Sequence, residues 1–306
     1  MYSNIKEHSM KFVDPRNDIA FKKIFGNENK KQILISFLNS ILDYWNTPKE
    51  ILEIELLNPY QAPKLEKLKE TILDIRARDR RDVTYIIEMQ IYHSSAFEKR
   101  VLYYTSKAYY LQVDRADNYP NLNQVIFIGF LDFFMFRDNP NYYTNHLILE
   151  KVSGNHYLKD FEFHFIELPK FTKTIDEIDE NSIREKWIYF VKNASNLDVI
   201  PKKLEHPKEF GEAFAIANTM SWSKDELDAY DMKWMYIQDE VGRIEQARND
   251  GMKEGIKEGI KEGIKEGINK GKLEAAQKMR ARGFSLEDIM DITGLNHDDL
   301  SGNGIR

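Results

Sequence analysis

The sequence predicts an α/β or α+β fold, in which helices flank a central sheet and a helical extension follows. Two observations support this prediction. Several runs of alternating apolar and polar residues have the length and period of β-strands, and helical patterns lie before, between and after them. The expected strands cover residues 51–60, 71–79, 83–92, 124–134, 146–152 and 161–170.

The helical segments are recognised by their apolar faces. The first covers residues 16–45, and Asn17 or Asp18 can cap its start. The second covers residues 95–113, between the third and fourth strands. Its apolar side carries Phe97, Val101, Tyr104 and Ala108. Residues 171–240 are then expected to form helices around Trp187, Phe190, Phe214, Trp222 and Trp234.

Composition limits the classes of function. The chain has 306 residues, 42% of them hydrophobic, which is enough for one large domain or two. Its net charge of −6 argues against a generally basic surface, so any nucleic-acid contact must come from a local patch. The absence of cysteine excludes disulfides, thiolate zinc sites and cysteine nucleophiles.

The most apolar run, VIFIGFLDFFMF at residues 125–136, is about half as long as a membrane-spanning helix and contains Asp132. The first residues, MYSNIKEHSMKF, lack the apolar core of a signal peptide. We therefore expect a soluble, cytoplasmic protein that spans no membrane.

The composition changes abruptly at residue 251, where tetrads of the type Gly-Ile-Lys-Glu begin. A boundary between residues 241 and 250 gives a first domain over 12–240, with its helical extension from about 171, and a second region over 241–306. In the tail, Ser285 and Asp288 form a capping-box pattern and Gly294 ends the helix. Both a helix-turn-helix and a structural helical cap fit this tail.

The tetrads carry a stripe of isoleucines that drifts by about 40° per tetrad on an α-helix. The stripe consists of Ile256, Ile260, Ile264 and Ile268. Each glycine costs a helix about 1 kcal/mol relative to alanine, and like charges four residues apart oppose it further. Two alternatives remain, namely a frayed linker and a helix ordered by self-association into a homodimer.

The stretch ILDIRARDRRDVTYIIEMQ predicts a β-hairpin with its turn centred on Arg81. Antiparallel pairing about this centre sets Asp74 opposite Glu88. One face of the hairpin is then apolar and consists of Leu73, Ile75, Ala77, Tyr85, Ile87 and Met89. The other face consists of Asp74, Arg76, Arg78, Thr84, Glu88 and Gln90.

Two carboxylates directly opposite each other have β-carbons about 5 Å apart and repel each other. Solvent relieves this repulsion if the polar face is simply exposed, and a divalent cation relieves it if the pair forms a site. Apart from Thr84, Glu88 and Gln90, residues 83–92 are apolar on both faces, so these polar residues interrupt a largely covered surface. This arrangement favours a magnesium site, because Mg²⁺ binds through one or two carboxylates and keeps several waters.

Asp74, the thirteen residues after it and Glu88-Met89-Gln90 together resemble the PD-(D/E)XK nuclease signature. The form is that of the Rpn recombination-promoting nucleases, also described as PD-(D/E)XK nuclease family transposases. DPRNDIAFKKIFGNENKKQILISFLNSIL is similar to their opening helix, and FEKRVLYYTSKAYYLQ to the helix after their hairpin. Two positions differ from the superfamily pattern, since Gln90 replaces the usual lysine and Leu73 the usual proline.

The resemblance implies a PD-(D/E)XK restriction-endonuclease-like core with a mixed central sheet, and a metal-dependent DNA endonuclease. Mg²⁺, with Mn²⁺ as a substitute, would be held by Asp74, Glu88 and the main-chain carbonyl of Met89. Gln90 would position the attacking water, although an amide cannot act as a general base. A role in recombination, mobile elements or toxin-like defence is implied. The alternative is a weak or inactive DNA-binding or assembly protein that keeps the fold.

Two further residues, Asp18 and Arg100, have two interpretations each. Asp18 is either an auxiliary acid or the N-cap of the opening helix. Arg100 either contacts the DNA backbone or pairs with a carboxylate. Arg76 and Arg78, with the lysines that flank the first helix, form a phosphate-binding patch only if they share a face with Asp74.

Overall fold

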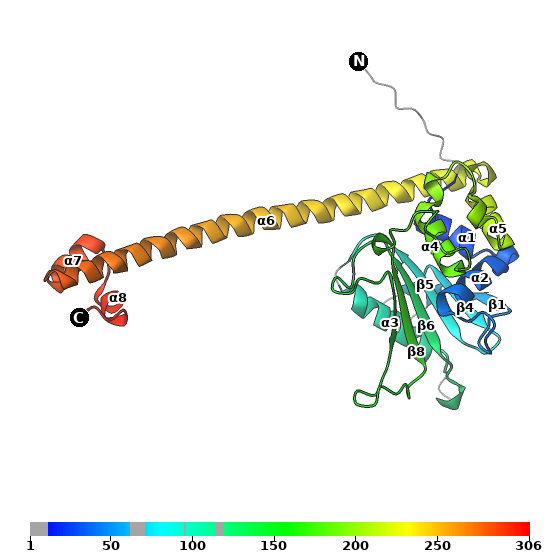
Figure 1. Ribbon diagram of the computed structural model, residues 1–306, viewed down its shortest axis with the longest axis horizontal. Helices are drawn as coiled ribbons and strands as arrows, with labels where there is room; N and C mark the ends of the chain where they lie inside the picture. Colours follow the sequence, from blue (N-terminus) through cyan, green and yellow to red (C-terminus); the bar gives the residue numbers. More distant parts are fainter. Residues whose placement is uncertain (1–11, 62–70, 95, 114–118) are drawn as a thin grey trace, which may run out of the picture. The chain divides into compact units, whose positions relative to one another are not determined.

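A six-stranded mixed sheet is the centre of the protein (Figure 1), with strand order β1-β4-β5-β6-β8-β7. The computed structural model describes residues 12–61, 71–94, 96–113 and 119–306. The strands of this sheet are β1 (Ile54–Leu57), β4 (Ile75–Asp79), β5 (Thr84–Gln90), β6 (Val125–Leu131), β7 (Tyr143–Leu147) and β8 (Phe161–Glu167). A separate two-stranded sheet pairs β2 (Tyr60–Gln61) with β3 (Thr71–Ile72).

Strands β5, β6 and β8 are parallel, whereas β1, β4 and β7 pair antiparallel with their neighbours. The carboxyl ends of the three parallel strands therefore meet at one edge of the sheet. Asp132, directly after β6, donates its N–H to the carbonyl of Gln90 at the end of β5, over 2.9 Å. Glu88, Asp132 and Glu167 all lie at or next to these carboxyl ends.

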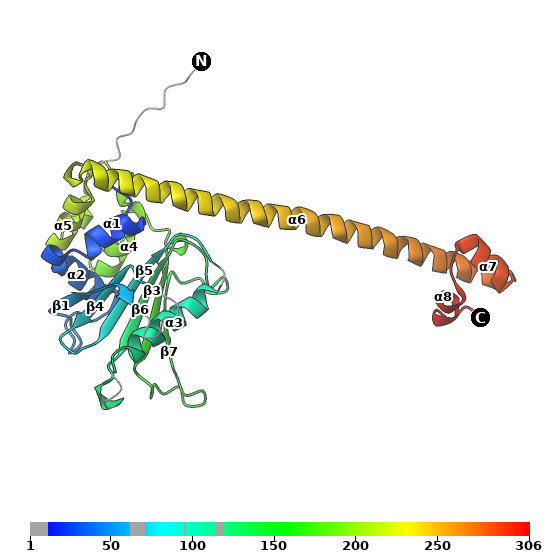
Figure 2. The same cartoon turned by 180° about the vertical axis from the view of Figure 1, so that it is seen from behind.

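Helices cover both faces of the sheet (Figures 1 and 2). One face packs against α1 (Asp18–Phe25), α2 (Lys31–Leu42), α4 (Ile183–Asn193) and α5 (Lys208–Ala217), and the other against α3 (Phe97–Tyr110). Alternation along β6 separates the two cores, since Ile126, Ile128 and Phe130 face the first group and Val125, Phe127 and Leu131 face α3. Short 3₁₀ helices cover Glu28–Lys30, Tyr119–Asn121, Leu168–Lys170, Ala194–Asn196, Lys202–Leu204 and Thr219–Ser221.

The α/β fold, the mixed sheet and the covering helices confirm the predicted fold class. The single opening helix over residues 16–45 is wrong, because the chain forms two helices there. Asn17 caps α1 by accepting the N–H of Ile19 over 3.0 Å. Gly26 ends α1 with an N–H bond to the carbonyl of Lys22, and a 3₁₀ turn leads into α2.

Three expected strands also differ from the observed ones. The run 51–60 divides into β1 and β2, and the run 71–79 into β3 and β4. The run 146–152 is shifted, because β7 covers Tyr143–Leu147 and the N–H groups of Val152 and Ser153 bond to the carboxylate of Glu150 in a turn. Local side-chain bonds thus end the strand earlier than the apolar pattern suggests.

The β4–β5 hairpin has the predicted register, with Ile75 opposite Ile87 and Ala77 opposite Tyr85. The predicted apolar face is wrong at Leu73, which packs in the α3-side core rather than with Ile75. The cause is the break between β3 and β4. The N–H of Leu73 bonds to the carbonyl of Pro59, beside the β2–β3 pair, and Leu73 is not part of the β4–β5 ladder.

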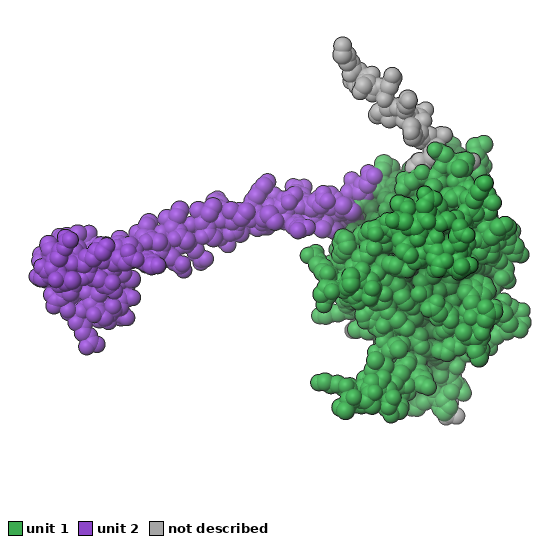
Figure 3. All heavy atoms as spheres, in the orientation of Figure 1, with its two compact units in different colours: residues 1–237 green, residues 238–306 purple. Residues whose placement is uncertain are grey.

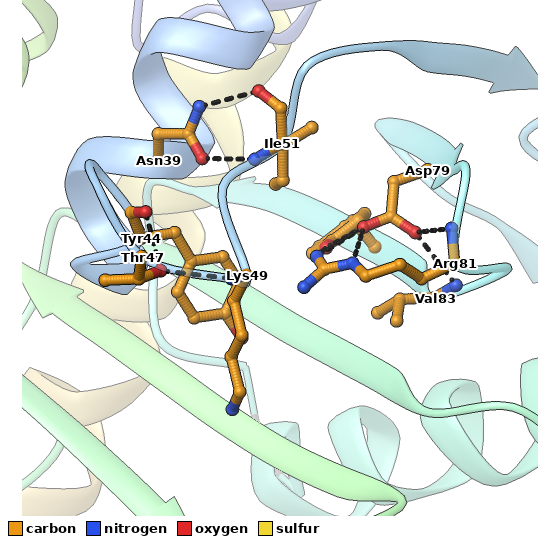
Figure 4. A network of polar contacts seen from close by, with 9 residues as sticks. Asn39, Tyr44, Thr47, Lys49, Ile51, Asp79, Arg81 and Val83 are labelled. Carbon is orange, nitrogen blue, oxygen red and sulfur yellow. Dashed lines mark hydrogen bonds and ion pairs between the residues drawn. The ribbon is translucent and has the colours of Figure 1, made fainter.

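The closed end of the hairpin is anchored by a buried carboxylate, that of Asp79 (Figure 4). It accepts the backbone N–H groups of Arg81 (2.8 Å) and Val83 (3.2 Å), the guanidinium of Arg81, and the hydroxyl of Tyr85 (2.8 Å). These bonds fix the turn, and with it the register at the hairpin's open end.

The long helix α6 (Lys224–Ala281) has 58 residues and includes all the tetrads. The tail adds α7 (Leu286–Thr293) and α8 (His297–Gly302), which pack on the end of α6 through Ala276, Ile289, Leu295, Leu300 and Ile305. The predicted ends of α7 are confirmed, because Ser285 caps the helix by accepting the N–H of Asp288 and Gly294 has a φ of 64°. Of the predicted capping box only this half forms, since Asp288 accepts the hydroxyl of Ser285 rather than its N–H.

By its internal contacts the chain divides into two compact units, residues 1–237 and 238–306 (Figure 3). The first unit thus includes the beginning of α6. Among the described residues, none of the helices combines the length and apolar character needed to cross a membrane.

Candidate functional site

A pocket of about 150 Å³ lies at the carboxyl end of β5. It is built from three parts of the first unit: the start of α1, the open end of the β4–β5 hairpin, and the beginning of α6. The lining residues are Arg16, Asp18, Asp74, Glu88, Met89, Gln90, Ile91, Tyr92, Lys233, Tyr236 and Ile237. The pocket therefore contains five of the predicted site residues.

Asp74 and Glu88 hold each other in place at the floor of this pocket. Because β3 ends before Asp74, the N–H of Asp74 is free of the ladder and donates to Oε1 of Glu88 over 3.2 Å. In return, the N–H of Met89 donates to Oδ2 of Asp74 over 2.8 Å. Each carboxylate thus accepts a backbone N–H from the opposite segment, and the predicted proximity of the two is observed.

Ionisation of this pair is unfavourable. Burial raises the pKa of Asp74, and Lys22 opposes that rise. Burial also raises the pKa of Glu88 well above its usual range, and the charge of Asp74 adds to the effect. Glu88 is only 7% exposed, so solvent cannot relieve the repulsion, and the solvated-face alternative is not observed.

Asp18 is the first residue of α1 and not its N-cap, because Asn17 caps the helix. The N-cap interpretation of Asp18 is therefore wrong. Its Oδ2 lies 3.0 Å from Nζ of Lys233 and 4.0 Å from Nζ of Lys22. Its Oδ1 is buried and has no hydrogen-bond partner among the described residues. A buried carboxylate oxygen without a donor is available to a water or a cation.

Gln90 is bonded at both ends of its amide. Its oxygen accepts Nη2 of Arg100 over 2.5 Å, and its nitrogen donates to the carbonyl of Tyr92 over 3.0 Å. Arg100 therefore bonds to an amide here and not to a carboxylate. Its positive charge still acts on Glu88, whose pKa it lowers against the effects of burial and Asp74. Nε of Arg100 is buried and unbonded within the described residues.

The two hairpin arginines lie in different places. Arg78 is exposed near the closed end and pairs with Glu55 over 2.8 Å, away from Asp74. Arg76 lines a second pocket, of about 180 Å³, which it shares with Asp74 and Lys22. Arg76 therefore lies next to Asp74, whereas Arg78 lies further along the same strand, at a different pocket.

Three cationic residues at the site, namely Arg16, Lys22 and Lys233, were not among the predicted site residues. Lys22 lies with its Nζ 3.2 Å from Oδ1 of Asp74. Its position four residues after Asp18 on one helix was an available signal. Lys233 contacts Asp18 from α6, and no local pattern indicates this contact because it depends on the path of the whole chain.

The residues present fit a divalent cation. Two interlocked carboxylates have raised pKa values, and a third carboxylate has a buried unbonded oxygen. No cluster of three or more His, Cys, Asp or Glu side chains that could hold a metal is found in the described part of the chain. A site with two carboxylates suits Mg²⁺, which keeps several waters, better than it suits zinc.

Comparison with known families agrees with this geometry. A family model described as PD-(D/E)XK nuclease family transposase matches residues 15–247. The chain belongs to this family. Every lining residue of the site pocket lies within the matched range of this PD-(D/E)XK family member, from Arg16 to Ile237. Neither the curated proteins nor the solved structures gave a match.

Membership in the family confirms the resemblance seen in the sequence and supports a nuclease-like function. PD-(D/E)XK nucleases generally use divalent metals, which agrees with the donor set of the site. The mixed six-stranded sheet with helices on both faces is consistent with the PD-(D/E)XK fold.

Proposed function

We propose that this protein is a metal-dependent DNA endonuclease that hydrolyses phosphodiester bonds at the pocket of Asp74 and Glu88. The observation that carries the proposal is the mutual bonding of the buried Glu88 and the partly buried Asp74. The N–H of Asp74 donates to Glu88, and the N–H of Met89 donates to Asp74. Such a pair is costly unless a cation compensates it, and the family supplies the reaction class.

Asp74, Glu88 and the carbonyl of Met89 would hold Mg²⁺, with Mn²⁺ as a substitute. When bound there, the cation would supply an acidified water and positive charge next to the scissile phosphate. Asp18 serves as an auxiliary acid, since Lys233 contacts one of its oxygens and leaves the other without a partner.

DNA is the proposed substrate, bound through local cations because the chain as a whole carries a net charge of −6. Arg76 and Arg100 are the proposed contacts to the backbone near the pocket, whereas Arg78 would contact DNA only beyond it. Each has a guanidinium suited to phosphate. The biological setting that we propose is recombination, mobile-element activity or toxin-like defence.

The alternative is a catalytically weak or inactive DNA-binding or assembly protein that retains the nuclease fold. The bonding of Gln90 favours this alternative. The residue that replaces the usual lysine has no charge, and its bonds to Arg100 and Tyr92 use one acceptor position and one N–H of its amide, so only one of each remains to orient a water.

A plasmid-nicking assay with Mg²⁺ tests the proposal. Asp74→Asn keeps the size and an acceptor oxygen but removes the charge, and should abolish nicking. Asp82→Asn is the matched control, because Asp82 is an exposed carboxylate at the closed end of the same hairpin and should leave nicking unchanged. Full activity in Asp74→Asn would refute the site. A wild-type protein that binds DNA without nicking it would support the alternative.

A further inference from the structure

Lys22 lies between two acidic residues of the site. Its Nζ is 3.2 Å from Oδ1 of Asp74 and 4.0 Å from Oδ2 of Asp18. The backbone that carries it is fixed, because the other face of α1 is fully buried in the core through Ala20, Phe21, Ile24 and Phe25. The positive charge of Lys22 therefore lies next to Asp74, a proposed metal ligand whose negative charge needs a counter-charge when no metal is bound.

The neighbouring lysines are engaged elsewhere. Lys23 pairs with Glu226 and lies over the ring of Trp222. Lys30 pairs with Glu212, and Lys31 with Glu28. Of these four lysines, Lys22 is the one whose charge is directed at Asp74. Its side chain is 38% exposed, so the ammonium can move without disturbing the core.

Gln90 supplies no charge and is bonded at both ends of its amide. The cationic part of the reaction must then come from another residue. Lys22 does not line the site pocket itself but borders the second pocket, which shares Asp74 with the first and carries Arg76 on the same side. A phosphate bound next to Asp74 on that side would meet Lys22 and Arg76 together.

We propose that Lys22 performs the task of the missing lysine, in two stages. Without metal its ammonium neutralises Asp74. When a divalent cation binds, the ammonium leaves Asp74 and donates hydrogen bonds to the scissile phosphate. This inference rests on the proposed nuclease function and assigns to that site a further catalytic residue.

The chemistry requires only charge from Lys22. In the hydrolysis, a water oxygen forms a bond to phosphorus and the bond from phosphorus to the leaving sugar oxygen breaks. One water proton passes to solvent, and the leaving oxygen acquires a proton. The ammonium forms and breaks no covalent bond, and it stabilises the extra negative charge on the phosphate oxygens.

The two stages make opposite predictions for one variant, Lys22→Met. Mg²⁺ measured by calorimetry without DNA should bind more tightly, by roughly 2- to 5-fold, because the competing ion pair is gone. Cleavage at saturating Mg²⁺ should fall by about 10²-fold, as for loss of one donor to a developing charge. Lys23→Met is the matched control on the same helix and should leave both measurements unchanged.

Lys22→Arg keeps the charge, so it should bind Mg²⁺ as the wild type does and recover part of the cleavage. A thermal melt checks that the methionine variant is folded. If it is not, Lys22→Arg still tests the role of the charge. Loss of both metal affinity and cleavage in folded Lys22→Met, or no change in either, would overturn the proposal. A wild-type protein that binds Mg²⁺ but cleaves no DNA would instead overturn the nuclease function itself.

Discussion

The side chains of Asp74 and Glu88 each bond to the other segment's backbone, so these two residues cannot be considered separately. Their charges repel in a buried site, and Lys22 relieves only part of this repulsion. The pair therefore lowers the stability of the metal-free protein, as expected if the proposed cation binds there.

Glu88→Gln isolates that cost, because glutamine keeps the acceptor oxygen for the N–H of Asp74 and removes the charge. Cleavage should be abolished. The melting temperature in EDTA should hold or rise, since the carboxylate repulsion is gone. Calorimetric melting beside the Asp82→Asn control checks this, and a clear drop in stability would show that the charge of Glu88 stabilises the fold instead.

Metal binding should itself be visible as stability. At 100 times its Kd, Mg²⁺ should raise the free energy of unfolding of the wild type by about 2.7 kcal/mol. The same titration should leave Asp74→Asn unshifted. Equal stabilisation of both proteins would place the metal somewhere other than at Asp74.

Gln90 and Arg100 form a second residue-level pair. Gln90→Lys alone would set two cations next to each other and should lower the free energy of unfolding by about 1–2 kcal/mol. The double variant Gln90→Lys with Arg100→Gln has one cation and one amide again, with their positions exchanged. It should recover most of the lost free energy of unfolding. Chemical denaturation of the single and double variants measures it. A double variant no more stable than Gln90→Lys would mean that the two positions act independently.

Much of this residue-level detail could be predicted from the sequence. Centring the turn on Arg81 was sufficient to bring Asp74 to Glu88, because register arithmetic is local. The charges around the pair were harder to identify. Lys233 reaches Asp18 only because the path of the chain returns α6 to the start of α1, and the bonding of Gln90 depends on how α3 packs.

At the scale of elements, the turn of the β4–β5 hairpin and the tetrads of α6 have separate tasks. The turn is held by the buried carboxylate of Asp79, and four groups donate to it. The tetrads form helix, but their isoleucines remain 55–58% exposed. The turn is thus stabilised by its own bonds, whereas the tetrads present an apolar stripe that is not covered within residues 238–306.

Asp79→Ala should therefore destabilise the protein by about 2–4 kcal/mol, because it leaves buried donors unpaired. Asp82→Asn, three residues further along the chain, is the control and should change stability by less than about 0.5 kcal/mol. Urea denaturation of both variants decides this. Similar midpoints for the two would mean that the turn does not depend on the Asp79 carboxylate.

The exposed stripe of α6 supports the proposal that the tetrads mediate homodimer formation. Truncation after Arg248 should shift the protein from dimer to monomer in analytical ultracentrifugation. Association should be weak and helped by moderate salt, which screens the repeated like charges. Metal-dependent cleavage should persist, because Lys233, Tyr236 and Ile237 remain. A truncated protein that sediments like the full-length chain would leave the tetrads as a spacer.

At the scale of the whole molecule, the periodicity of apolar residues predicts the type of most elements but not the residues at which they begin and end. The fold class and the α3 face were predicted, and both are observed. The breaks at Gly26 and at Leu73–Asp74 were missed, because they are set by caps and by bonds to Pro59 and Glu88. The sheet order was not predictable either, since it depends on pairings between distant strands.

The anchored turn of the hairpin has an evolutionary consequence. An extra residue between Asp74 and Asp79, or between Val83 and Glu88, would turn one carboxylate to the other face of the sheet. An extra residue next to Arg80 would displace some of the bonds to Asp79 but would keep the two strand segments in phase with each other. Insertions and deletions among relatives that retain the carboxylate pair should therefore occur in the loop and be absent from the two strand segments. The spacing of the motif can then vary in length only where the chain turns.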